Sequence, residues 1–216
     1  HDVAYWFMEW QKQKDEKKRN LFYDFYHNSV LISASSVLSV VKGFSMKMQM
    51  AITGRGGQGV LFLTRILTEC ALDLGLEVIA SETHGMAMRG GSVISTVKVG
   101  PFRGPLIRSS QADVMLVLDE GSMETFGHLL AKKGKCFLNS PASSSPLSID
   151  ATGLAAGMDA PLMANLVLLG FALRHNGLFC DYPLTESVTG RISPEHFRQA
   201  NLKALKLGYS FGDSGR

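Results

Sequence analysis

The sequence contains little cysteine, and its cysteines are dispersed. Only three occur in 216 residues, at Cys70, Cys136 and Cys180, and no two form a C-x-x-C pair. This spacing argues against a disulfide framework, a zinc site or an iron–sulfur cluster carried by this chain. We therefore expect a reducing, cytoplasmic compartment, with each cysteine serving as a small buried hydrophobic side chain.

Long apolar runs and a charge excess are also missing. A membrane helix needs about 20 apolar residues, and the nearest run, residues 30–41, is shorter and broken by four serines. No small-residue cleavage site follows it, which argues against a signal peptide. The net charge is only +3, and no basic helix or aromatic–basic platform accompanies it. We expect neither a membrane nor a nucleic-acid partner.

Recognisable catalytic groups are absent as well. There is no Ser/His/Asp or Cys/His arrangement at a known spacing and no pair of carboxylates with an acid–base role. We assign no catalytic residue and no metal ligand to this chain. What is present is an ordinary globular composition, 45% hydrophobic and 19% charged, long enough for one or two domains with a sizeable core.

The first 46 residues differ from the rest. Both tryptophans and a stripe of tyrosines and phenylalanines surround a charge run at residues 12–19. Their helical spacing predicts amphipathic helices, whose aromatic stripe is either core or a docking surface. We expect a helical N-terminal extension over residues 1–46 and a main domain over 47–212. Deletion of residues 1–45 tests whether the extension is dispensable for folding.

From Met50 onward, strand and helix patterns alternate. Continuous apolar runs suit a sheet covered on both faces, and the alternation predicts an α/β three-layer sandwich with a mostly parallel, Rossmann-like sheet. Strands are predicted at residues 50–53, 77–81, 92–99, 114–118, 136–139 and, more weakly, 148–150. Helices are predicted at residues 59–74, 121–132, 161–174, 183–189 and 194–207.

A glycine-rich turn follows the first strand. Gly54, Gly56 and Gly59 fit G-x-G-x-x-G between a strand and a helix, the order that begins a dinucleotide-binding unit. Glu82 ends the next strand at about the spacing of a ribose-binding acid. The alternative is a tight turn for close helix–sheet packing. Arg55 adds a positive charge at a helix start, where a phosphate can also bind. Gln58 is suited to hydrogen bonds across an interface.

A second motif spans residues 81–92 and joins two predicted strands. Instead of a purely polar loop it places methionines, a histidine and an arginine between glycines, a set suited to a packed, charge-bearing contact surface. Arg89 can pair with a carboxylate or a phosphate through two hydrogen bonds. His84 either titrates near neutrality or is held by backbone hydrogen bonds.

Together, the two motifs resemble a known family. Residues 54–60 and 81–93, in this order, resemble the gamma-type subunits of the 2-oxoacid:ferredoxin oxidoreductases. Within that family they are most similar to the small (beta) subunits of indolepyruvate ferredoxin oxidoreductases. Residues 105–107, 112–116 and 200–209 support the resemblance, which runs from about residue 48 to 209 and leaves out the extension.

The resemblance implies a division of labour. Such enzymes convert a 2-oxoacid, coenzyme A and oxidised ferredoxin to an acyl-CoA, carbon dioxide and reduced ferredoxin, with thiamine diphosphate and iron–sulfur clusters in partner subunits. This chain would bind none of these cofactors alone, would be inactive alone and would meet ferredoxin only indirectly. The implied phosphate or coenzyme A contact comprises Gly54, Arg55, Gly56, Gly57, Gln58 and Gly59. The implied interface or active-site rim comprises Glu82, His84, Met86, Met88, Arg89, Gly90 and Gly91.

Two other functions stay open at this point. One is a stand-alone NAD(P)- or FAD-binding oxidoreductase that uses the glycine turn; the other is a non-enzymatic α/β binding module. The His-Gly-Met-Ala sequence of the second motif favours an aryl pyruvate as the substrate over pyruvate, a branched-chain oxoacid or 2-oxoglutarate. Subunit stoichiometry does not follow from the sequence.

Overall fold

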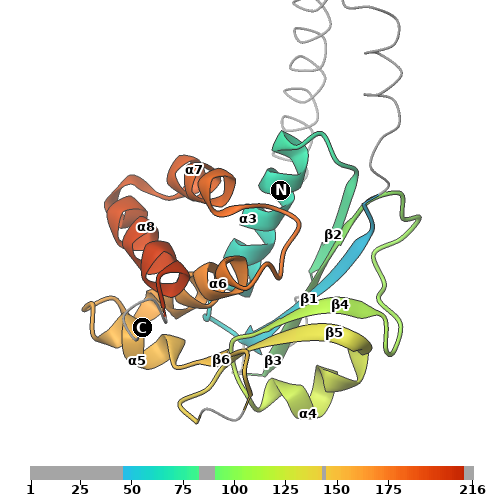
Figure 1. Cartoon of the computed structure of the whole chain (residues 1–216), viewed down its shortest axis with the longest axis horizontal. Helices are drawn as coiled ribbons and strands as arrows, with labels where there is room; N and C mark the ends of the chain where they lie inside the picture. Colours follow the sequence, from blue (N-terminus) through green and yellow to red (C-terminus); the bar gives the residue numbers. More distant parts are fainter. Residues whose placement is uncertain (1–45, 83–90, 143–144, 212–216) are drawn as a thin grey trace, which may run out of the picture. The chain divides into compact units, whose positions relative to one another are not determined.

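The apolar runs pair into one twisted sheet in the computed structural model, which describes residues 46–82, 91–142 and 145–211. Within these residues the sheet has six strands in the order β2-β3-β1-β4-β5-β6 (Figure 1). They are β1 (Met48–Arg55), β2 (Val78–Glu82), β3 (Ser92–Val99), β4 (Ala112–Val117), β5 (Leu130–Asn139) and β6 (Ser148–Ile149). All six agree in position with predicted strands, although β5 begins earlier than expected. The expected N-terminal extension lies outside the described residues, apart from its last position.

The strand directions follow from the connections. In the described sheet, three pairings are parallel, β1–β4, β4–β5 and β5–β6, and two are antiparallel, β1–β3 and β2–β3. A parallel return needs a crossover of a dozen residues or more, and the connection from β2 to β3 is shorter than that. β3 therefore runs against both its neighbours. The mostly parallel sheet that was predicted is confirmed, with β3 as its reversed member.

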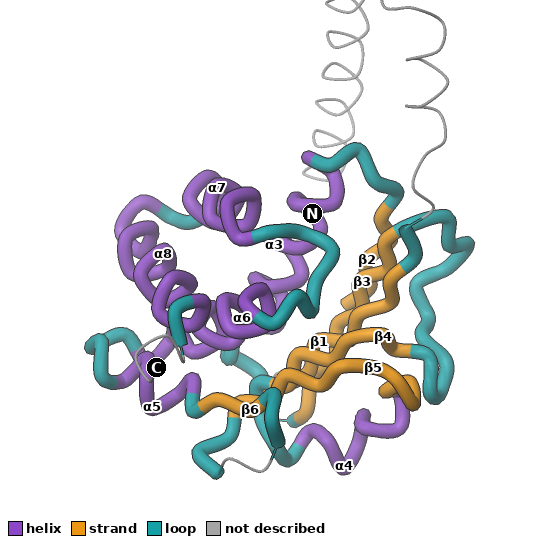
Figure 2. Tube along the Cα trace, in the orientation of Figure 1, coloured by secondary structure: helices purple, strands orange, loops and turns teal. Residues whose placement is uncertain are grey.

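Helices cover both faces, but unequally. On one face lie α3 (Val60–Asp73) and α6 (Ala164–Arg174), with α7 (Tyr182–Ile192) and α8 (Glu195–Tyr209) packed against them (Figures 1 and 2). Among the described residues, the other face carries α4 (Ser122–Phe126), the 3-10 turn Gly127–Leu129 and the loop from β3 to β4. The short helix α5 (Ala151–Ala156) follows β6, and the 3-10 turn Pro161–Met163 precedes α6.

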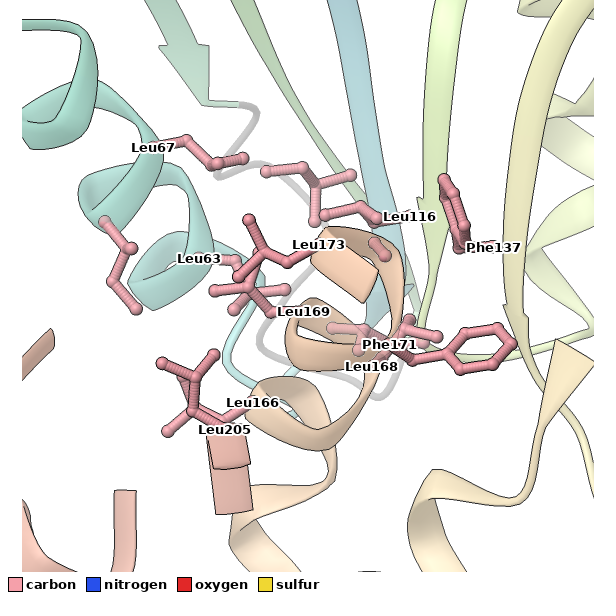
Figure 3. Close-up of a cluster of buried hydrophobic side chains, with 14 of the residues drawn as sticks. Leu63, Leu67, Leu116, Phe137, Leu166, Leu168, Leu169, Phe171, Leu173 and Leu205 are labelled. Carbon is pink, nitrogen blue, oxygen red and sulfur yellow. The ribbon is translucent and has the colours of Figure 1, made fainter. Parts of the chain in front are cut away.

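The main core lies between the sheet and α3, α6 and α8. Leu63 and Leu67 of α3 belong to the same buried cluster as Leu116 and Phe137 of the sheet, and leucines of α6 lie among them (Figure 3). Nine of the eleven α6 residues are buried, because the sheet covers one side and α8 the other. The second core is smaller and lies on the opposite face, around Met115 and Val117.

One predicted helix ends too late, and one short helix was not predicted. The helix predicted over residues 121–132 ends as a 3-10 turn at Leu129, because Leu130 pairs with Ala112 and starts β5. Helix α5 was not predicted, since its short Ala-Thr-Gly-Leu-Ala-Ala sequence gives a weak periodic signal. Its start is fixed instead by Asp150, whose carboxylate accepts a hydrogen bond from Gly153 N at 2.7 Å. Such a cap typically contributes about 1 kcal/mol.

The described residues contain neither a membrane-spanning helix nor a metal-binding cluster. None of their helices is both long and apolar enough to cross a membrane. They also contain no group of three or more His, Cys, Asp or Glu side chains placed to hold a metal ion.

Candidate functional site

The glycine turn and the described ends of the second motif lie at one edge of the sheet. The glycine turn follows β1, and loops also leave β4 and β5 at this edge because the three strands are parallel. The second motif follows β2, and its far end enters β3 at Ser92, which pairs with Arg55. Ligands of α/β sheets usually bind beyond the carboxyl ends of the strands, which makes this edge the candidate site.

The glycine turn is a tight reversal that leads directly into α3. Gln58 N donates to Arg55 O at 3.1 Å, and Gly57 and Gly59 take φ values of +90° and +81°. Gly59 is the N-cap of α3 and contributes no side-chain cap. The backbone N–H groups of the first helical turn, together with the helix dipole, therefore form a weakly electropositive surface suited to an anion.

The side chain of Gln58 stabilises this turn through hydrogen bonds to the backbone. Its Oε1 accepts a hydrogen bond from Arg55 N at 2.7 Å, and its Nε2 lies 3.5 Å from Leu118 O. A side chain at Gly54 would displace it, since a Cβ there would lie 2.8 Å from Gln58 Oε1 and 3.0 Å from Leu118 Cβ. The glycine at position 54 is thus required by packing against β4.

Arg55 places a positive charge at this edge and forms an ion pair with Asp119. Its Nε lies 3.0 Å from Asp119 Oδ1, and the two side chains are 60% and 19% exposed. A pair this exposed contributes only about 0–1 kcal/mol to stability. Its effect is to orient the guanidinium between the loops that follow β1 and β4.

Two buried or half-buried asparagines connect these loops and were not identified from the sequence. Asn139 Nδ2 donates to Leu118 O and to Thr152 Oγ1, both at 2.9 Å, and Asn139 Oδ1 accepts from Thr152 N at 3.2 Å. Asn165 Nδ2 lies 3.4 Å from Gly59 O. In the sequence, Asn165 interrupts an apolar run and Asn139 ends one.

The described ends of the second motif lie where the sequence placed them. Glu82 ends β2, and Gly91 directly precedes β3. The other predicted members of this motif lie outside the described residues: His84, Met86, Met88, Arg89 and Gly90.

The strand order places Glu82 away from the glycine turn. In a dinucleotide-binding fold the second strand lies beside the first. Here β3 separates β2 from β1, so Glu82 lies two strand spacings, about 10 Å, from the strand that precedes the turn. The ribose role considered for Glu82 does not fit this order.

The cysteines do not contribute to this edge. Cys70 and Cys180 are buried as predicted, and both hydrogen-bond with Thr185 Oγ1 in the helical layer. The hydrogen bond with Cys180 and burial raise the pKa of the Cys70 thiol. Burial also raises the pKa of Cys136, which is half-buried rather than fully buried. Cys70 and Cys136 therefore remain protonated at neutral pH and are poor nucleophiles.

The fold and this edge define an α/β module whose candidate ligand site lies beyond the carboxyl ends of its parallel strands. Residues 49–211 match the protein family described as pyruvate ferredoxin/flavodoxin oxidoreductase, and the chain belongs to that family. The resemblance inferred from the two motifs is thereby confirmed.

Relatives in this family match at nearly full length. The indolepyruvate oxidoreductase subunit IorB of Archaeoglobus fulgidus is 29% identical over 197 residues, which cover 79% of this chain and 98% of that protein. IorB of Pyrococcus horikoshii is 29% identical over 185 residues, covering 73% and 92%.

Solved structures share the fold. The gamma subunit of a keto/oxoacid ferredoxin oxidoreductase from Geobacter sulfurreducens superposes with a TM-score of 0.62 at 21% identity, covering 78% of this chain and 99% of that one. The pyruvate oxidoreductase subunit PORC of Thermotoga maritima gives 0.63 at 23% identity, covering 76% and 96%.

Proposed function

We propose that this chain is the gamma-type subunit of a 2-oxoacid:ferredoxin oxidoreductase that depends on thiamine diphosphate and iron–sulfur clusters. The assembled enzyme would convert a 2-oxoacid, coenzyme A and oxidised ferredoxin to an acyl-CoA, carbon dioxide and reduced ferredoxin. The observation that carries the proposal is the position of the glycine turn and of the described ends of the second motif, Glu82 and Gly91, at one edge of a single α/β unit. Relatives of matching length that are named as subunits support it.

Within that enzyme, we assign the glycine turn to an anionic group. The unpaired first-turn amides of α3 and the guanidinium of Arg55 offer a helix dipole and one positive charge within a few residues. A phosphate of coenzyme A matches both features. The ends of the second motif at Glu82 and Gly91 lie on the same edge and would border the contact with the partner subunits.

The cofactors then belong to the partners. Thiamine diphosphate and the clusters would be held by other subunits, which would pass electrons to ferredoxin. The three cysteines are free thiols, which agrees with a chain that works in a reducing cytoplasm. An indolepyruvate-type substrate is favoured by the relatives named IorB.

Reconstitution tests the proposal. The full chain is produced together with the thiamine-dependent, cysteine-rich subunit encoded beside it, and ferredoxin reduction is assayed over indolepyruvate, pyruvate, a branched-chain oxoacid and 2-oxoglutarate. We expect co-purification and activity that requires both chains and coenzyme A. A partner preparation that is equally active without this chain would contradict the proposal.

A titration of the isolated chain with dinucleotides distinguishes the proposed subunit from a stand-alone NAD(P)- or FAD-binding oxidoreductase. With NADH, NADPH or FAD we expect no saturable fluorescence change, because Glu82 is misplaced for a ribose. Saturable binding of a dinucleotide in the micromolar range would favour a stand-alone oxidoreductase instead.

A further inference from the structure

The loop between β3 and β4, residues 100–111, lies far from the glycine turn. It leaves β3 at Val99, which pairs with Met48 at the start of β1, and it enters β4 at its first residue. Both ends of the loop are therefore at the edge opposite the candidate site. Figure 2 shows the loop running beside the sheet, from the end of β3 to the start of β4.

Neighbouring side chains in this loop face in opposite directions. Ile107 is 4% exposed and packs into the smaller core with Met115 and Leu129. Leu106, directly before it, is 77% exposed. Ile107 thus anchors the loop to the sheet, and the same anchoring turns Leu106 outward.

A buried lysine fixes the backbone that carries Leu106. Lys98 is 7% exposed, and its Nζ donates to Leu106 O at 2.8 Å while lying 4.6 Å from the centre of the Phe102 ring. Thr96 Oγ1 donates to Pro105 O at 3.1 Å. Burying the ammonium group of Lys98 costs free energy. In this position the group fixes the backbone of Leu106 so that the leucine side chain stays in solvent. Preorganisation of this kind lowers the entropy cost of binding.

The charged side chains of this loop are all basic. Arg103 and Arg108 are exposed on either side of Leu106, and residues 100–111 contain no acid. Hydrogen bonds from Ser110 N to His128 O and from Gln111 N to Leu129 O bring the loop beside residues 128–139. That segment adds exposed Lys132 and Lys133 and also contains no acid. The carboxylate of nearby Asp113 accepts a hydrogen bond from Gln49 N at 2.8 Å.

We propose that Leu106, flanked by Arg103 and Arg108, docks into an apolar recess rimmed by carboxylates on another subunit of the same oxidoreductase. This inference rests on the proposed function and adds a second contact, at the edge of the sheet opposite the glycine turn. A buried apolar anchor within a charged rim is the usual composition of a protein interface.

Other occupants fit the same surface less well. A second copy of this chain in a two-fold arrangement would bring the arginines of both loops together. A surface that binds single-stranded nucleic acid usually presents aromatic side chains for base stacking, whereas this loop presents a leucine. Charge complementarity therefore favours an acidic protein surface.

The experiment compares variants of the full chain in assembly with the thiamine-dependent partner subunit. We expect Leu106→Asp to weaken the Kd at least about tenfold. The control is Leu74→Asp, at a 48% exposed leucine at the end of α3, and should change the Kd by less than about twofold. The double variant Arg103→Glu, Arg108→Glu should weaken binding and reduce its dependence on salt concentration. Circular dichroism and urea unfolding of each variant establish that the chain is folded.

Each outcome decides one question. If the Leu106 and arginine variants both bind the partner subunit with the wild-type Kd, the proposed contact through residues 100–111 is wrong. The proposed function would be unaffected by that result. A change confined to self-association of the isolated chain would also overturn the proposed contact, in favour of a second copy. No assembly of the wild-type chain with the partner subunit would count against the proposed function itself.

Discussion

Gly57 and Gly59 share a left-handed backbone but not the same surroundings. A Cβ at Gly59 would overlap the side-chain amide of Asn165, whereas a Cβ at Gly57 would meet nothing within 4 Å. We expect Gly57→Ala to lower the free energy of unfolding by roughly 1–2 kcal/mol through strain alone. Gly59→Ala should cost roughly 3 kcal/mol, since Asn165 must also move and lose its bond to Gly59 O. Urea unfolding of both variants measures the difference, and equal losses would show that Asn165 exerts no constraint.

At the residue scale, the sequence predicted the glycine turn but not the contacts of its side chains, since Gln58 was expected at an interface and instead accepts a hydrogen bond from Arg55 N. The hydrogen bonds inside the glycine turn join Arg55 and Gln58, three positions apart, and the turn was visible as a motif. Asn165 contacts Gly59 across 106 positions, and Asn139 contacts Leu118 across 21. Contacts of that range arise only when the strand order is known. A polar residue in an apolar run marks such a position without naming its partner.

Helices α6 and α8 approach each other through glycine. A Cβ at Gly170 would overlap Leu205 O, and one at Gly208 would overlap Val167 O. Either change to alanine should push the helices apart and lower the free energy of unfolding by roughly 2–3 kcal/mol. Gly190 in α7 is the control, because a Cβ there comes no closer than 3.9 Å to Leu202. Gly190→Ala should stabilise the chain by up to about 1 kcal/mol through helix propensity. Chemical denaturation compares the three variants, and a harmless Gly170→Ala would contradict the close approach.

Element prediction succeeded where periodicity is strong and failed where pairing decides. The apolar strands and the long helices α3 and α8 were located from their patterns. Residues 130–132 continue a helical pattern, yet Leu130 joins the sheet opposite Ala112. The reversal of β3 likewise follows from a connection too short for a crossover, which only becomes informative once β2 and β3 are known to be neighbours.

At the scale of the whole molecule, residues 45–216 form one compact unit. We expect the chain that begins at Met46 to fold cooperatively with a Tm within about 3 °C of the full chain. The deletion keeps Met46, whose carbonyl packs so closely against Gly100 that a Cβ there would overlap it. A deeper deletion through Met50 removes part of the central strand β1 and should abolish folding. Thermal unfolding by circular dichroism tests both, and loss of folding in the shorter deletion would show that residues 1–45 belong to the folded unit.

The order of the elements along the chain has a consequence for biosynthesis. All six described strands lie before residue 150, whereas α6, α7 and α8, which cover the larger apolar face, lie after it. A ribosome therefore releases the complete sheet while one face is shielded only by α3. Helix α6 alone does not complete this layer, since nine of its eleven residues are buried between the sheet and α8, and α8 follows α6 and α7 in the described chain. We expect nascent chains that stall before α8 to expose this apolar face and to aggregate more readily than chains that include α8.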